Sequence, residues 1–103
     1  MKKVDLYLQT RKGKCLIKAY DFGKGLYIHR SLENDETGEL YTGNYWTISV
    51  KAGFSVKDFN YTPMKLKDVI LQAQKLLKLD WSHENWIKVN MMPYKQAYNE
   101  LKG

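Results

Sequence analysis

Nucleophilic catalysis has one candidate pair in this chain, a cysteine and a histidine. Cys15 and His29 fall on neighbouring predicted strands, with Asp21 in the turn between them. A catalytic cysteine needs a base within hydrogen-bond reach and surroundings that stabilise its thiolate. Cys15 instead follows the pattern of a buried, inert thiol, because Leu16 and Ile17 come directly after it. An enzyme built on this pair is therefore the third of the three functions considered below.

Metal and phosphate chemistry has weaker signals. The two histidines lie far apart in sequence, and the chain has no CxxC or HExxH spacing. The acidic stretch 33–44 is similar to a calcium loop, but its twelfth position is Asn44 where a bidentate Glu is needed. The Gly-Lys-Gly turn at 23–25 lacks the spacing of a phosphate-binding loop and precedes a strand. We therefore expect no metal, no cofactor and no catalytic residue.

Basic and aromatic side chains give a stronger signal, which points to binding. The net charge is +6, and residues 1–30 carry eight bases against two acids, whereas residues 31–50 carry four acids and no base. This separation favours an electrostatically steered contact, although a solvated lysine-rich surface has the same composition. The predicted contact residues are Arg11, Lys12, Lys14, Lys24, Arg30, Tyr7, Tyr27 and Tyr45.

A sheet is needed to position these side chains, and the first half of the chain predicts one. Apolar and polar residues alternate with the period of half-buried strands, and glycine-containing turns follow the first two of them. The predicted strands are 3–9, 15–20, 26–32, 45–51 and a short one that carries Phe54 and Val56. Tight connections of this kind predict an antiparallel meander of four or five strands.

The alternation also divides the predicted sheet into two faces. Val4, Leu6 and Leu8 mark one face of the first strand. On the opposite face, we expect tyrosines to lie between the basic residues and to offer stacking surfaces. These tyrosines are Tyr7, Tyr20, Tyr27 and Tyr45.

The second half of the chain predicts two helices. Thr62 is a suitable N-cap and Pro63 suits the first helical position. An amphipathic pattern then runs through Leu66, Val69, Ile70, Ala73, Leu76 and Leu77. Residues 86–89 are suited to an edge strand, and Pro93 begins a last helix with Tyr94, Ala97, Tyr98 and Leu101 on one face. With both helices packed on the meander, residues 1–103 form a single α+β domain.

The cellular compartment follows from cysteine usage and from the absence of targeting segments. Cys15 is the sole cysteine, which is typical of a reducing compartment. The N-terminal stretch has lysines but no apolar core of a secretory signal, and no later stretch is apolar enough to span a membrane. The sequence therefore predicts a cytoplasmic protein without membrane contact.

The central stretch YWTISVKAGFSV, residues 45–56, resembles small proteins of phages and mobile elements of Gram-positive bacteria. In those proteins a similar strand and glycine turn precede an amphipathic helix. The resemblance extends over residues 45–79 and implies a phage-type accessory protein. Such proteins often bind and block host machinery, as anti-CRISPR inhibitors do. Many of those inhibitors are acidic DNA mimics, and the basic charge of this chain disfavours that mode.

Three functions are therefore considered. The first is a non-enzymatic binding module, a phage-encoded regulator or inhibitor of a host protein or nucleoprotein complex. Exposed aromatic and arginine side chains are favoured at such interfaces. The second is a protein that binds nucleic acid directly through the same basic, tyrosine-bearing face. The third is the small enzyme with a Cys/His site. The sequence leaves the oligomeric state open.

Overall fold

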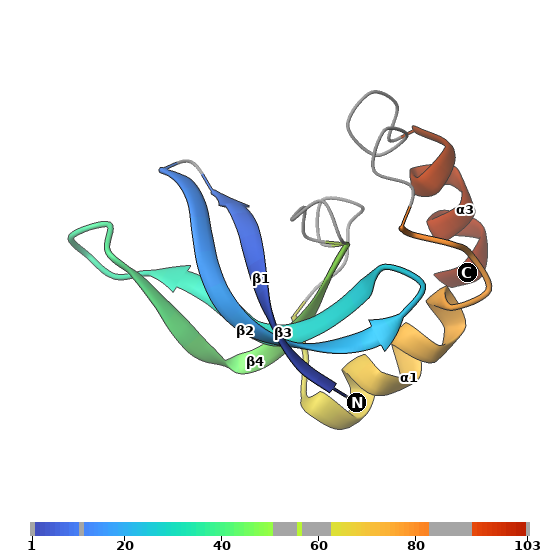
Figure 1. The fold of residues 1–103 in the computed structure, drawn as a ribbon, viewed down its shortest axis with the longest axis horizontal. Helices are drawn as coiled ribbons and strands as arrows, with labels where there is room; N and C mark the ends of the chain where they lie inside the picture. Colours follow the sequence, from blue (N-terminus) through green and yellow to red (C-terminus); the bar gives the residue numbers. More distant parts are fainter. Residues whose placement is uncertain (1, 11, 51–55, 57–62, 83–91, 103) are drawn as a thin grey trace.

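The computed structural model describes residues 2–10, 12–50, 56, 63–82 and 92–102, which form one antiparallel sheet and two helices (Figure 1). Four strands pair in chain order: β1 (Lys2–Thr10), β2 (Gly13–Gly23), β3 (Leu26–Asn34) and β4 (Leu40–Val50). The helices are α1 (Leu66–Leu76) and α3 (Met92–Lys102). The predicted α+β fold, an antiparallel meander followed by two helices, is confirmed.

Two of the predicted strands cannot be compared with this sheet. The edge strand at 86–89 and Phe54 of the short fifth strand lie outside the described residues. Val56 is described: it has 3₁₀ and not strand geometry, and it is fully buried in the main hydrophobic core.

The four strands form two hairpins that share only a short stretch of pairing. β1 pairs with β2 along its whole length, from Lys2 to Thr10. β2 and β3 pair only close to their shared turn, where Tyr20 lies opposite Ile28. The hairpins therefore separate beyond this stretch (Figure 1), and a lysine side chain connects their tips. At the tips, the Lys12 Nζ donates a hydrogen bond to the Gly38 carbonyl at 2.6 Å.

The helices cover one face of the β3–β4 hairpin and build the main core there. The cross-strand pairs Leu26–Val50 and Ile28–Ile48 are completely buried. The predicted apolar stripe of α1 supplies the buried residues Val69, Ala73 and Leu76, and that of α3 supplies Tyr94 and Tyr98. Burying these aliphatic and aromatic surfaces is the principal driving force for this packing.

A second apolar cluster occupies the other face of the sheet. It contains Leu6, Leu8 and Ala19, with Tyr27 among the partly buried side chains packed against it. Residues directly opposite each other in a ladder point to the same face, so the Tyr20–Ile28 pair puts Tyr20 on the helix-covered face. The helices therefore lie on the face of Tyr20, not on the face of Leu6 and Leu8.

The start of α1 differs from the prediction. Thr62 lies outside the described residues, and Pro63 is not helical. Met64 instead forms an isolated bridge with Trp46, in which each N–H donates to the other's carbonyl, at 2.7 and 2.9 Å. This pairing keeps the chain extended through Lys65, and the helix begins at Leu66 without a side-chain cap. The prediction of Pro63 as the first helical residue is wrong, because a tertiary contact overrides the local capping signal.

Trp81 joins the helices to the turn between β2 and β3. Its ring is fully buried and stacks on Tyr94 at a centroid distance of 4.7 Å. Its Nε1 donates to the Leu76 carbonyl at the end of α1, and its backbone N–H donates to the Lys24 carbonyl, both at 2.7 Å. Lys24 also donates from Nζ to the Leu77 carbonyl at 2.8 Å. This network fixes the C-terminal end of α1 against the sheet.

Candidate binding groove

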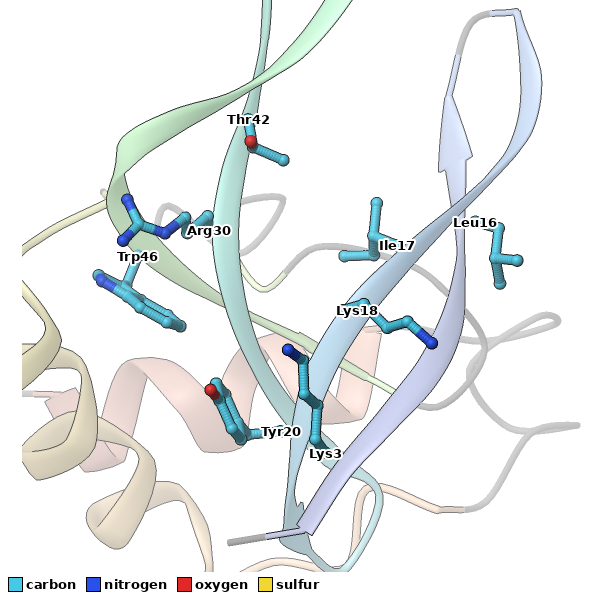
Figure 2. Close-up of a pocket in the computed structure, with 8 residues that line it drawn as sticks. All are labelled: Lys3, Leu16, Ile17, Lys18, Tyr20, Arg30, Thr42 and Trp46. Carbon is cyan, nitrogen blue, oxygen red and sulfur yellow. The ribbon is translucent and has the colours of Figure 1, made fainter.

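The space between the two separating hairpins forms a groove of about 360 Å³ (Figure 2). We call it the Trp46 groove. Its lining residues come from β1, β2, β3 and β4, and they are Lys3, Leu16, Ile17, Lys18, Tyr20, Arg30, Thr42 and Trp46. Among these described residues three are basic, two are aromatic and none is acidic. The lining therefore combines positive charge with flat apolar surface.

Two aromatic rings and a guanidinium group lie together in the groove. The Arg30 Cζ is 5.2 Å from the centre of the Trp46 ring, within the range of a cation–π interaction. The Tyr20 ring centre is 6.0 Å from that of Trp46, with the planes tilted by 36°. Trp46 is half-buried and also packs against the main core, so one part of the ring is held in place.

The groove begins where the cover provided by the helices ends. Along β3, the inward series reads Leu26, Ile28 and then Arg30, and each residue pairs across the sheet with β4. The first two members are buried, whereas Arg30 is exposed. Arg30 therefore marks the point along β3 at which this face changes from buried core to solvent-exposed surface.

The β1–β2 hairpin extends the basic and aromatic surface beyond the groove. On the same face as Tyr20, the register pairs Lys3 with Tyr20, Asp5 with Lys18, Tyr7 with Leu16 and Gln9 with Lys14. We call this set the β1–β2 ladder. Tyr7 and Leu16 are 58% and 51% exposed, although both are large and apolar. Lys18 forms an exposed salt bridge with Asp5.

Only some of the contact residues predicted from the sequence lie at this surface. Arg30 lines the groove, and Tyr7 and Lys14 belong to the β1–β2 ladder. Tyr45 is exposed in β4, but it directly precedes Trp46 in the strand and is not among the lining residues of the groove. Arg11 lies outside the described residues.

Three of the predicted contact residues have other roles in the fold. Lys12 and Lys24 donate their Nζ hydrogen bonds to the carbonyls of Gly38 and Leu77. Tyr27 packs against the cluster of Leu6, Leu8 and Ala19, so it lies on the opposite face from Tyr7. The expectation that all four tyrosines share one face is therefore wrong.

Sequence reasoning did not select Trp46 as a contact residue. Trp46 alternates with Ile48 and Val50, so the pattern indicates an ordinary core residue. A usable signal was nevertheless present in β3. Arg30 follows Leu26 and Ile28 at every second position, and a strand partner of such an arginine is expected to lie at the margin of the core.

The Cys15–His29 pair does not form. Cys15 lies opposite Leu8 in the β1–β2 pairing, whereas His29 lies opposite Thr47 in β4. Both ring nitrogens of the buried His29 are occupied, with Nδ1 2.7 Å from the Arg30 carbonyl and Nε2 2.7 Å from Ser49 Oγ. Because a carbonyl only accepts, Nδ1 carries the proton and Nε2 accepts from the serine.

Burial and hydrogen bonding shift the pKa of His29 in opposite directions. Burial lowers the pKa of His29, and the hydrogen bond to the Arg30 carbonyl opposes this more weakly. His29 is therefore a neutral, buried side chain with a structural role. It fixes the backbone at Arg30, where the β3–β4 register shifts.

The acidic loop between β3 and β4 is held by hydrogen bonds to the carboxylate of Asp35. Asp35 Oδ1 accepts from the Thr37 N–H, the Thr37 hydroxyl and the Glu39 N–H, at 2.7 to 3.0 Å. These bonds hold the pKa of Asp35 below its usual value, with the Thr37 hydroxyl as the largest contributor. No cluster of three metal-ligating side chains occurs in the described ranges. The loop is thus built as a hairpin tip.

Comparisons with known proteins give no match: no family model, no curated protein and no solved structure is similar to this chain. The resemblance to phage proteins therefore stays a prediction. Within the part of the chain that the structure describes, no helix is long and apolar enough to cross a membrane.

Proposed function

We propose that this protein is a non-enzymatic binding module that holds an anionic partner in the Trp46 groove. The observation that carries the proposal is the Arg30–Trp46 pair, a cation over an indole ring in an open groove with two further lysines. Leaving a charged group without a partner costs free energy when the group is buried, but not when water solvates it. The cations and rings of a solvent-facing groove therefore stay available to bind a partner.

The charges around the groove support an anionic partner. Lys3, Lys18 and Arg30 line it, Asp5 pairs with Lys18 outside the lining, and the acids of the β3–β4 loop lie at the hairpin tip. A positive groove bounded by a negative loop attracts an anion and also orients it. A host protein with an acidic patch and a nucleoprotein complex both meet this requirement.

An enzymatic role has less support from the geometry. The candidate nucleophile Cys15 and the candidate base His29 have different strand partners, and the hydrogen bonds of His29 go to Ser49 and Arg30. Nucleophilic catalysis by cysteine requires the two groups in contact. The Cys/His alternative therefore ranks last.

The setting of this binding role is part of the proposal. The sole cysteine, Cys15, is a free thiol and favours the cytoplasm. Together with the phage-like central stretch, this favours a regulator or inhibitor of host machinery in a bacterial cytoplasm.

The proposal can be tested by capture from a bacterial lysate with tagged wild-type protein and two variants. Arg30→Gln removes one of the three groove cations, and Lys75→Gln removes one exposed cation from α1, away from the groove lining. We expect a bound component that Arg30→Gln loses and Lys75→Gln retains. Equal capture by all three proteins would place the binding surface elsewhere and refute the proposal.

A further inference from the structure

We infer that the anionic partner of the Trp46 groove is a single-stranded nucleic acid, with one base stacked on Trp46 and the backbone following the β1–β2 ladder. This inference rests on the proposed function and names the chemistry of the partner. It is carried by three features of the described surface: ring geometry, the spacing of the cations and the shape of the groove.

The rings of the groove are arranged as a stacking platform. Trp46 is fixed on one side by the main core, and Tyr20 lies 6.0 Å away in a tilted orientation. A flat base can therefore stack on an aromatic face that is already ordered, which limits the entropy lost on binding. A groove of about 360 Å³ is at the small end of ligand sites and suits one base-sized group.

The cations are spaced as a backbone track. Along β2, Lys14, Leu16, Lys18 and Tyr20 point to the same face, so positive and apolar side chains alternate. From Lys14 to Tyr20 this face extends about 20 Å, at roughly 3.3 Å per residue. Phosphates contact the lysines and bases contact the apolar side chains in such an arrangement, which needs no particular base sequence.

The recessed position of Trp46 favours a single strand over a duplex. The half-buried ring lies over the β3–β4 hairpin, beside Arg30 and Tyr20 (Figure 2). Bases in a duplex are stacked on each other and cannot enter such a recess, whereas unpaired bases can turn outward and stack on side chains.

The composition of the groove also favours nucleic acid over protein. Lysine is depleted at protein–protein interfaces, whereas arginine and aromatic residues are enriched there. The Arg30–Trp46 pair suits either kind of partner, and the two lysines that line the same groove favour nucleic acid. An acidic protein surface is therefore the second choice, and the experiment below separates the two.

Fluorescence anisotropy with labelled probes tests the inference. The probes are an oligothymidylate and an oligouridylate of about 12 nucleotides, and a duplex of equal length. Binding is measured between about 50 and 200 mM salt, because phosphate contacts determine the salt dependence. The variants are Trp46→Leu and Tyr20→Leu, which keep apolar bulk but remove a ring, and Arg30→Gln, with Lys75→Gln as the control. Thermal melting confirms that each variant is folded.

We expect a single-stranded probe to bind at least about tenfold more tightly than the duplex, and Trp46→Leu to weaken binding about tenfold. Arg30→Gln should reduce the slope of log affinity against log salt by about 1, while Lys75→Gln should leave affinity unchanged. Tyr20→Leu should weaken binding less than Trp46→Leu and provides the test if the latter fails to fold.

Two results would overturn the inference without overturning the proposed function. One is equal affinity for duplex and single strand with no effect of either ring substitution. The other is capture from nuclease-treated lysate of a protein that Arg30→Gln loses, together with no binding of the oligonucleotides. If Arg30→Gln alters neither oligonucleotide binding nor lysate capture, the inference and the proposed function both fail.

Discussion

The helices bury one half of a sheet face and leave the other half exposed to solvent. Over the base of β3 and β4, α1 and α3 cover the pairs Leu26–Val50 and Ile28–Ile48 and bury them completely. The next pair along the same strands, Arg30–Trp46, and the neighbouring β1–β2 ladder stay open. The alternation of residues in a strand shows which side chains share a face, but not which of them the helices cover. Candidate binding residues lie on the part of the face that the helices leave exposed.

The largest expected difference between the halves is the stability cost of losing a tryptophan. Trp81→Ala removes a fully buried ring, its stacking on Tyr94 and its bond to the Leu76 carbonyl. We expect it to lower the free energy of unfolding by about 3–5 kcal/mol, whereas Trp46→Ala should cost about 1–2 kcal/mol. Urea denaturation followed by circular dichroism measures both. Similar costs would mean that the groove is as essential to the fold as the covered half.

A smaller effect is expected from a glycine on each side of this division. Gly25 has a φ of +84°, and a Cβ there would lie 2.5 Å from the Ser82 backbone nitrogen. Gly25→Ala should therefore lower the free energy of unfolding by about 2–3 kcal/mol, through both backbone strain and a clash that cannot relax easily. Gly13 also has a positive φ, of +105°, but nothing lies near its added Cβ.

Gly13→Ala is thus the matched control, with strain alone and an expected cost of about 1 kcal/mol. Thermal melting of the two variants at the same pH gives the comparison. If both variants lose the same free energy of unfolding, the clash with Ser82 does not contribute to the effect of Gly25→Ala.

The pH dependence of stability should identify His29 as a buried residue on the opposite face of the sheet. Since burial lowers its pKa, the unfolded chain binds a proton at His29 more readily than the folded protein does. The stabilising contribution of neutral His29 is therefore complete above about pH 6.5, its ordinary pKa, and declines as the pH falls below that value. Denaturation midpoints between pH 7 and about pH 5 should show this decline.

His29→Gln should make the midpoints less dependent on pH over that interval. The chain has one other histidine, and His83→Gln provides the control. A pH dependence that His29→Gln leaves intact and His83→Gln removes would assign the effect to the wrong histidine and contradict the prediction.

The smallest expected effect is at the salt bridge of the open half. Asp5→Asn removes the partner of Lys18 on an exposed ladder, so the free energy of unfolding should change by less than about 0.5 kcal/mol. Affinity for the single-stranded probe should rise about threefold at low salt, because an acid is lost and Lys18 becomes available to phosphates. Anisotropy titrations measure the change. A fall in affinity would show that Asp5 positions Lys18 for binding.

Much of the fold could be predicted from local patterns. The alternation at β1 and the helical spacing of Val69, Ala73 and Leu76 each identify an element and its buried face correctly, whereas β4 also buries Thr47 and Ser49 on its other face. The contact residues were less predictable. Arg30 was selected for its charge, but Lys24 was selected for the same reason and instead binds the Leu77 carbonyl at the end of α1.

The sequence by itself determined the strands, the helices, the tight turns and the excess of positive charge, because each depends on residues close together in the chain. Only the tertiary structure decided that Tyr20 lies on the face that the helices cover and that Tyr27 lies on the opposite face. It also decided that the Arg30 guanidinium lies over the Trp46 ring. Those relations depend on strand register and on where the helices stop covering the sheet. Both are set by packing between segments that are distant in sequence, and no local pattern records them.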